Sequence, residues 1–127
     1  MITHKDLTLW KKGIELVKHI YLITDSFPKS ERFGLVSQMR RCVISIPSNI
    51  AEGCGRNSDN ELIHFLYVAL GSTSELETQI IISVELNFLD NEKATECLSL
   101  LNEIIRMITS LVKSIKTRSS KSVTRNL

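Results

Sequence analysis

The stretch IAEGCGRNSDNE, residues 50–61, holds the end of one predicted helix and the start of the next. Its Gly-Cys-Gly run around Cys54 predicts a helix end, since glycine readily adopts the backbone conformations found at helix C-termini. Ser58 and Glu61 then match a capping box, in which a serine hydroxyl and a glutamate carboxylate close the first turn of a helix. Two helices joined by so short a turn run antiparallel and pack side by side.

Apolar residues on both sides of this turn recur every three or four positions, which is the period of one helical face. Before the turn, these residues are Leu35, Met39, Val43, Ile46 and Ile50. Pro47 lies within this series and predicts a kink, because proline has no amide hydrogen to donate. After the turn, the pattern runs from residue 62 to residue 88 and predicts one long helix.

The same period predicts one helix at each end of the chain. The first begins near Leu7 and ends before Phe27-Pro28, since the residue before a proline avoids the helical conformation. The last is capped by Asp90-Asn91 and continues to residue 116. No stretch alternates with a period of two, so the sequence predicts an all-α, antiparallel up-down-up-down four-helix bundle.

Charge divides the chain into two unequal parts. Residues 1–112 carry 11 basic and 14 acidic side chains, a net charge of −3, whereas residues 113–127 carry five basic side chains and no acidic one. We therefore expect a bundle domain over residues 1–116 and a basic, flexible tail over residues 117–127.

The last predicted helix is more apolar than a single inward face requires. Branched aliphatic residues fill six of the twelve positions from 104 to 115, namely Ile104, Ile105, Ile108, Leu111, Val112 and Ile115. So wide an apolar face predicts burial against a partner. Because closed symmetric assemblies of one chain are the commonest oligomers, we expect this partner to be a second copy.

Several classes of protein are not favoured by the sequence. The N-terminal residues lack the basic and apolar regions of a signal peptide, and no apolar run approaches the roughly 18 residues of a membrane span. The three cysteines form no CxxC pair and predict no disulfide framework. We therefore expect a cytoplasmic protein that makes no membrane contact.

Catalytic and metal sites are not predicted either. Glu61 and His64 form one Glu-x-x-His motif, whereas a di-iron bundle requires two. No Walker sequence, no Ser-His-Asp arrangement and no metal-spaced set of cysteines and histidines is present. We expect no catalytic residue, no metal and no cofactor, and therefore no enzyme.

Polar residues line one side of the second and third predicted helices, beside the apolar series. They are Arg40, Arg41, Ser45, Asn49 and Glu52 on the second helix, and Glu75, Glu77 and Gln79 on the third. Because a carboxylate inside a bundle needs a partner, we expect one of the two arginines to pair with Glu75 or Glu77. We interpret this polar network as fixing the register of the helices; the alternatives are a small-molecule or nucleic-acid pocket and plain solvent exposure of these side chains.

Five short motifs follow one another in a fixed order along the chain. They are DLTLW at residues 6–10, FPKSERFGL at residues 27–35, QMRR at residues 38–41, SIPSNIAEGCGR at residues 45–56 and GSTSELETQ at residues 71–79. Their order and spacing resemble the four-helix-bundle family of 23S rRNA-intervening-sequence proteins, from residue 4 to residue 115.

The resemblance implies a homopentameric ring of four-helix bundles, encoded in some bacteria within insertions in the 23S ribosomal RNA gene. A similar bundle, the accessory variability protein of diversity-generating retroelements, is a basic pentameric barrel that binds nucleic acid and a reverse transcriptase. The resemblance therefore implies a non-enzymatic scaffold that binds RNA or DNA. The alternative is a protein-binding adaptor that acts with a nucleic-acid enzyme such as a reverse transcriptase, without direct nucleic-acid contact.

Basic side chains are the candidates for nucleic-acid binding, since they contact phosphates without reading sequence. They are Lys113, Lys116, Arg118, Lys121 and Arg125 near the C-terminus, with Lys11, Lys12 and Arg56 as additional candidates. A solvated terminus without a ligand is the alternative, because no aromatic residue lies among the C-terminal charges for base stacking.

Overall fold

The computed structural model describes residues 3–125, without the side chains of Asp6 and of residues 120–125. Short 3-10 helices cover His4–Asp6 and Lys29–Glu31. The four α-helices are α1 (Thr8–Thr24), α2 (Leu35–Cys54), α3 (Asp59–Glu85) and α4 (Asn91–Arg125). No strand occurs among the described residues, and the predicted all-α class is confirmed.

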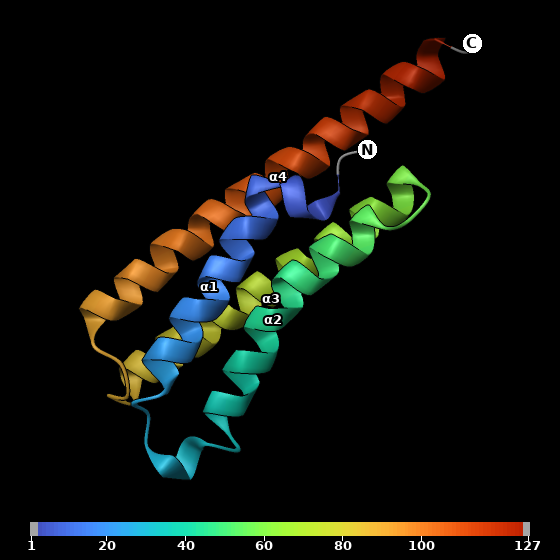
Figure 1. The fold of residues 1–127 in the computed structure, drawn as a ribbon. Coiled ribbons are helices and arrows are strands. Elements are labelled where there is room, and N and C mark those ends of the chain that lie inside the picture. The colour runs from blue at the N-terminus through green and yellow to red at the C-terminus, as the bar shows by residue number, and fades with distance from the viewer. Residues whose placement is uncertain (1–2, 126–127) are drawn as a thin grey trace.

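The helices form an antiparallel bundle in which sequence neighbours lie side by side (Figure 1). α1 packs against α2, α2 against α3 and α3 against α4, while α4 also packs against α1 and closes the bundle. Across the described part of the chain, the diagonal pairs α1–α3 and α2–α4 do not approach each other closely. This is the up-down-up-down arrangement that the sequence predicted.

Side chains cap the two later helices where the sequence places caps. Ser58 Oγ accepts a hydrogen bond from the Glu61 amide (3.2 Å) and starts α3. Asp90 Oδ1 accepts a hydrogen bond from the Lys93 amide (2.8 Å) and starts α4. Each cap satisfies an amide that has no partner within its own helix.

The Gly-Cys-Gly run ends α2, although not through the backbone conformation expected of glycine. Gly55 follows the helix with a φ of −84°, and no described glycine has a positive φ. A Cβ built on Gly53 would lie 3.0 Å from atoms of both Leu62 and Phe65. The missing side chain of Gly53 therefore lets the start of α3 pack directly against the end of α2.

A second glycine sets the distance between α1 and α2. Gly13 is buried in α1, and a Cβ built there would lie 3.2 Å from Cβ of Pro47 in α2. Proline inside a helix removes one backbone hydrogen bond. Here the Pro47 ring is buried against α1, so it fills the space that the absent Gly13 side chain leaves open.

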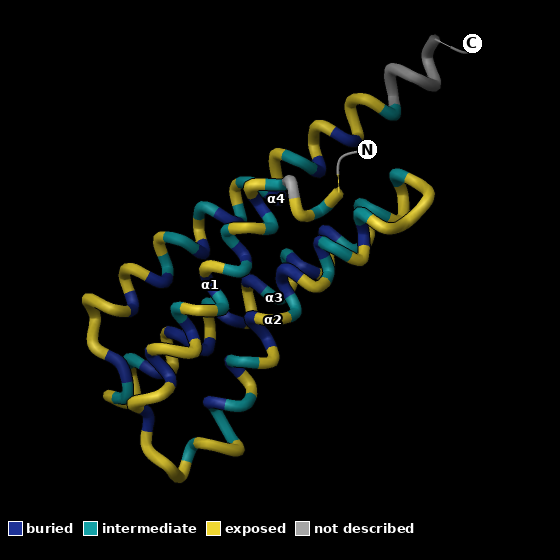
Figure 2. The backbone as a smooth tube through the Cα atoms, viewed as in Figure 1, coloured by how far each residue is buried: buried dark blue, intermediate teal, exposed yellow. Residues whose placement is uncertain are grey.

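One continuous apolar core runs along the bundle (Figure 2). Every helix contributes fully buried side chains, including Leu16 and Ile20 of α1, Met39 and Ile46 of α2, Leu76 and Ile80 of α3, and Leu101 and Ile108 of α4. None of the described helices combines the length and the hydropathy needed to span a membrane.

The apolar face of α4 is covered within the chain, so the prediction of an uncovered face on this helix is wrong. The residues concerned are buried (Ile104, Ile108, Val112 and Ile115) or partly buried (Ile105 and Leu111). Because α4 packs against both α1 and α3, its apolar face has two neighbours to cover and must be wide.

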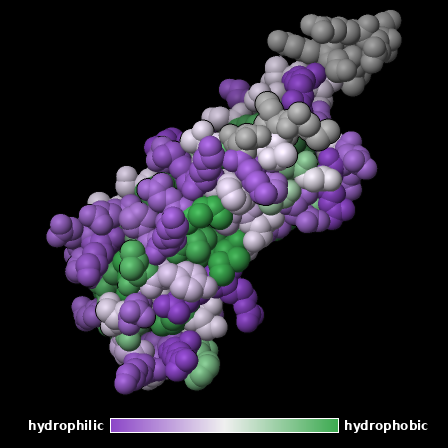
Figure 3. Space-filling view, viewed as in Figure 1, coloured by the Kyte–Doolittle hydropathy of each residue, from purple (hydrophilic) through white to green (hydrophobic). Residues whose placement is uncertain are grey.

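The exposed large hydrophobic side chains lie on other elements. They are Tyr21, Leu22, Phe33, Ile44, Tyr67, Val68, Ile81, Ile82 and Leu86. α3 and its C-cap carry more of them than any other element does. Figure 3 shows hydrophobic surface midway along one face of the molecule, between ends that are mainly hydrophilic.

α4 is also longer than the sequence pattern predicts, since it continues past residue 116 to Arg125. Arg118 Nη2 and Ser119 Oγ donate hydrogen bonds of 2.9 and 2.6 Å to the Asp59 carboxylate at the start of α3. Lys116 Nζ donates to the Tyr67 hydroxyl at 2.8 Å. These polar contacts hold α4 against α3 beyond the last apolar residue of the pattern.

Candidate functional site

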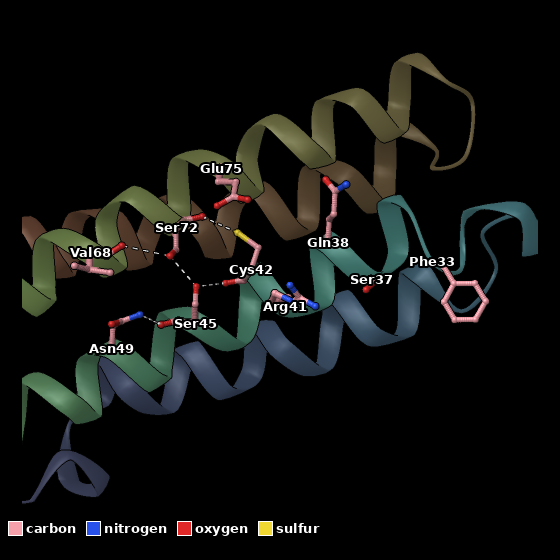
Figure 4. A pocket seen from close by; sticks show the side chains of 10 residues that line it. All are labelled: Phe33, Ser37, Gln38, Arg41, Cys42, Ser45, Asn49, Val68, Ser72 and Glu75. Carbon is pink, nitrogen blue, oxygen red and sulfur yellow. Dashed lines mark hydrogen bonds between the residues drawn. The ribbon is translucent and has the colours of Figure 1, made fainter.

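A groove of about 540 Å³ lies between α2 and α3, on the side where the sequence predicted a polar network (Figure 4). Its floor is built from small polar side chains. The Ser45 hydroxyl lies 2.7 Å from Ser72 Oγ and also within hydrogen-bonding distance of the Cys42 carbonyl oxygen. Asn49 Nδ2 donates to the Ser45 carbonyl oxygen at 2.7 Å, and Cys42 Sγ donates to the Ser72 carbonyl oxygen at 3.2 Å.

These bonds join α2 to α3 at one height along the bundle. Sliding one helix by a turn would separate Ser45 from Ser72 and leave partly buried hydroxyls without partners, which is costly. The geometry is consistent with the interpretation that the network fixes helix register. The groove side chains are neutral hydroxyl, amide and thiol groups, apart from the apolar Phe33 and Val68 and the exposed, charged Arg41 and Glu75.

The predicted arginine–glutamate pair is wrong. Arg40 turns toward α1, where its Nε donates to Thr24 Oγ1 at 3.0 Å and its guanidinium lies 4.4 Å from the Tyr21 ring centroid. Arg41 forms no ion pair among the described residues. Adjacent residues on a helix point about 100° apart, so the two arginines face different neighbours.

The predicted acidic members of the network also take other partners. Glu52 is exposed and pairs with Arg56 at 2.6 Å. Glu75 accepts a hydrogen bond of 3.4 Å from Gln79 Nε2. Glu77 is partly buried on α3 and takes no part in the described bonds of the groove. Gln79 itself is 5% exposed, and its Oε1 has no partner among the described protein atoms.

The thiols of the chain are held in their protonated form. Burial, together with the nearby Glu75 carboxylate, raises the pKa of Cys42 to about 12. Burial raises the pKa of Cys97 to about 11, with Glu96 adding to the effect, and burial also raises the pKa of the half-buried Cys54. A thiol acts as a nucleophile through its thiolate, so this environment suits packing better than covalent chemistry.

We expect iodoacetamide at pH 8 to alkylate Cys54 before Cys42 and Cys97 in the folded protein. Cys42 and Cys97 are buried and have little thiolate at this pH, so we expect their reaction to be slower by more than about tenfold. Peptide mass mapping over a time course measures the three rates. Denatured protein is the control, in which all three should react alike; preferential labelling of Cys42 in the native state would contradict the assignment.

Metal-binding and imidazole groups do not assemble in the described part of the chain. No group of three or more histidine, cysteine, aspartate or glutamate side chains is arranged there to hold a metal. His64 is exposed, and its ring packs 5.1 Å from the ring of Phe65. His19 lies 3.9 Å from Glu15 on the surface of α1.

The predicted nucleic-acid-binding residues lie at one end of the bundle, where α1 begins, α2 turns into α3, and α4 runs past both (Figure 1). The side chains of Lys121 and Arg125 are outside the described residues. Among the others, Lys11 and Lys113 are exposed, and Lys116 contacts the Tyr67 ring at 5.3 Å. The remaining three form ion pairs, namely Lys12 with Glu103 (3.1 Å), Arg56 with Glu52 (2.6 Å) and Arg118 with Asp59 (2.9 Å).

Carboxylates are therefore interleaved with the basic residues at this end. The hydrogen bond from Ser119, together with the charge of Arg118, lowers the pKa of Asp59, which stays ionised at neutral pH. Exposed ion pairs are weak, so a phosphate group can replace the carboxylate partner of an arginine. This end of the bundle is a mixed surface rather than a continuous basic patch.

Sequence reasoning missed the outward face of α3. Val68, Ile81 and Ile82 are exposed there, and Gly71 lies among them with no atom within 4 Å of a Cβ built on it. Within the apolar pattern from residue 62 to residue 88, a second apolar edge is formed by Ile63, Leu70, Ile81 and Phe88, and this edge was the signal for the face. Periodicity alone does not show which of two apolar edges turns toward the core.

Comparison with known proteins gives a match over most of the chain. The family model described as 23S rRNA-intervening sequence protein matches residues 5–110. A solved protein with unknown function from the S23 ribosomal protein family of Bacteroides thetaiotaomicron VPI-5482 has a similar fold, with a TM-score of 0.76 and 22% identity. The alignment covers 84% of this chain and 99% of that chain. No curated protein matches the chain.

Proposed function

The chain belongs to the 23S rRNA-intervening sequence protein family, which confirms the resemblance of its motifs, and from this premise we propose that it is a non-enzymatic scaffold built from several copies of itself. Five copies form the ring, as the resemblance implies. The scaffold offers basic side chains to RNA or DNA. The observation that carries the proposal is the outward face of α3, where the apolar side chains of Val68, Ile81 and Ile82 remain 39%, 48% and 41% exposed.

This α3 face has the properties of a helix–helix contact between subunits. Val68, Ile81 and Ile82 are partly exposed on this face, with the exposed polar residues Ser74, Glu75 and Thr78 between them in the sequence, and burying such apolar side chains is favourable by roughly 25 cal/mol per Å² of apolar area. Gly71 costs helix stability compared with alanine, and no neighbour within the chain makes use of its small size. A helix from a second copy can approach closely at Gly71, which accounts for a glycine at this position.

Nucleic-acid binding by the scaffold is supported by the basic side chains gathered at one end of each bundle. A closed ring brings five copies of this end together, so weak phosphate contacts add through multivalency. The salt dependence of such binding should be steep, since each phosphate contact releases counterions. The protein-binding adaptor is the alternative, and it predicts capture of a partner enzyme without salt-sensitive binding of RNA.

We expect sedimentation equilibrium of the unmodified protein to give about five times the mass of a single chain. Ile81→Glu places a charge in the proposed contact, and Gly71→Leu blocks the close approach of a second helix, so both variants should sediment as single chains. Neither change disturbs packing within the bundle, because Ile81 is exposed and Gly71 has open space around it.

Ser99→Glu on the exposed side of α4 is the matched control and should leave the mass unchanged. Circular dichroism checks that every variant remains helical. A single-chain mass for the unmodified protein at micromolar concentration would refute the scaffold. An oligomer that survives both α3 substitutions would place the subunit contact elsewhere.

A further inference from the structure

A second groove, of about 490 Å³, lies beside the connection between α1 and α2 and combines arginines with aromatic rings. Tyr21 comes from α1, Arg32 and Phe33 from the connection, and Arg40, Arg41 and Ile44 from α2. This connection is at the opposite end of the bundle from the basic residues discussed above (Figure 1). The groove is therefore separate from those basic residues, and it adjoins the groove between α2 and α3, with which it shares Phe33, Ser37 and Arg41.

The positive charge of this groove is not paired with any carboxylate that the structure describes. Arg32, Arg40 and Arg41 form no ion pair among the described residues, and no carboxylate lines the groove. The acidic residues nearby are Asp25, which lines an adjoining groove of about 240 Å³, Glu31 in the same connection, and Glu75, which lines the groove between α2 and α3. Three guanidinium groups without carboxylate partners favour a polyanion, since arginine binds phosphate oxygens through several donors at once.

The Phe33 ring of the groove is open to a flat ligand. Phe33 is 90% exposed, and its ring stands clear of the helices (Figure 4). Arg32 lies 5.6 Å from the Phe33 ring centroid, and Arg40 lies 4.4 Å from that of the half-exposed Tyr21. Each ring thus has a cation beside it, which is the combination that nucleic-acid-binding proteins use to hold a base and its phosphate.

We propose that this groove binds single-stranded nucleic acid, with a base stacked on Phe33 and the flanking phosphates held by the arginines. A single strand fits because an unpaired base can reach the exposed ring, whereas the bases of a duplex are stacked on one another. Recognition is by charge and stacking, so it is tolerant of sequence. The inference rests on the nucleic-acid part of the proposed function and assigns it a site outside the predicted basic residues.

The Tyr21–Arg40 pair joins the two walls of the groove before any ligand arrives. Arg40 Nε also donates to Thr24 Oγ1 at 3.0 Å, so its guanidinium is held in place over the Tyr21 ring. Arg41 is exposed and forms none of these bonds, which leaves its charge available to a phosphate. Arg40 is therefore a positioning residue, and Phe33 and Arg41 are the residues that we expect to touch the ligand.

The test is fluorescence anisotropy with a labelled single-stranded oligouridine at low and moderate salt, using the full chain. Phe33→Ala should weaken binding roughly 5- to 100-fold, because one stacked base is lost. Arg41→Gln should weaken binding and lower the slope of log affinity against log salt by about one. Phe33→Trp keeps a stacking surface and should restore binding to at least the original level. The duplex of the same length should bind more weakly than the single strand.

Matched controls separate this groove from general surface effects. Leu22→Ala removes another exposed apolar side chain of α1, and Lys18→Gln removes an exposed charge, and both should bind as the unmodified protein does. Circular dichroism checks that each variant is folded. Because Phe33 is 90% exposed, we expect its replacement to leave the fold unchanged.

Three outcomes would overturn the inference, and they distinguish failure of this groove from failure of the proposed function. Binding that survives Phe33→Ala and Arg41→Gln but is lost in Lys113→Gln/Lys116→Gln would keep the proposed function and remove this groove. A change in oligomeric mass on Phe33→Ala, with unchanged RNA binding, would make the groove a subunit contact. Absence of any RNA binding at low salt would remove both the groove and the nucleic-acid part of the proposed function.

Discussion

Leu16→Ala is expected to lower the free energy of unfolding by about 2 to 5 kcal/mol. Leu16 lies in α1 with its side chain fully buried in the apolar core. Truncation removes apolar contacts and leaves a cavity that the surrounding helices only partly fill. The loss is a large share of the stability of an ordinary domain, so we expect an unfolding transition at much lower urea concentration.

Leu22→Ala, six residues along the same helix, is the matched control. Leu22 is 74% exposed, so the same substitution should change the free energy of unfolding by less than about 0.5 kcal/mol. Urea titration followed by circular dichroism measures both variants. Protein concentration must be held constant, because the stability of an oligomer depends on it. Equal effects of the two substitutions would contradict the position of α1 in the bundle.

Gly53→Val is expected to destabilise the bundle by about 1 to 3 kcal/mol, the usual range for overpacking. Even the first added carbon would lie 3.0 Å from Leu62 Cδ1 and Phe65 Cβ, and 3.2 Å from the Leu62 carbonyl oxygen. Two of these three atoms cannot move without moving α3, because one is a backbone oxygen and the other is a Cβ. The substitution must therefore push the start of α3 away from the end of α2.

Gly55→Val is the control for the turn. A Cβ built on Gly55 meets only ordinary contacts, at 3.6 and 3.7 Å from the carbonyl oxygens of Glu52 and Ala51, and its φ is negative. We expect a change in the free energy of unfolding of less than about 1 kcal/mol at this position. Thermal and urea unfolding of the two variants test the difference. If Gly55→Val were the more damaging of the two, backbone conformation rather than space would be the reason for glycine in this turn.

The helices and their order were predictable because both depend on local information. The three-to-four residue period sets each helical stretch, and Ser58 and Asp90 cap helices through bonds to residues three positions away. Short connections then leave antiparallel neighbours as the simplest packing. The polar join between α2 and α3 was predictable in part, since Ser45 and Asn49 belong to it as expected.

The remaining features depend on contacts between distant parts of the chain. The direction of Arg40 is decided by Thr24 on α1, and the length of α4 is supported by Asp59, about 60 residues earlier in the sequence. The burial of the α4 apolar face depends on how many neighbours that helix has. Phe33 lies in a connection with no apolar period, so no pattern distinguishes an exposed aromatic residue from a buried one there.

The contact of Gly13 with Pro47 has a consequence for how α1 and α2 move. The Pro47 ring of α2 packs against α1 at Gly13, where α1 has no side chain. Sliding or rotating α1 would bring one of its side chains against this ring, so the contact resists both motions. α1 and α2 therefore behave as one rigid body. The part of the groove that they share, between Tyr21 and Arg40, is therefore formed by two helices in a fixed relative position. Binding there costs little conformational entropy in α1 and α2, so the affinity depends mainly on how much conformational freedom the ligand itself loses.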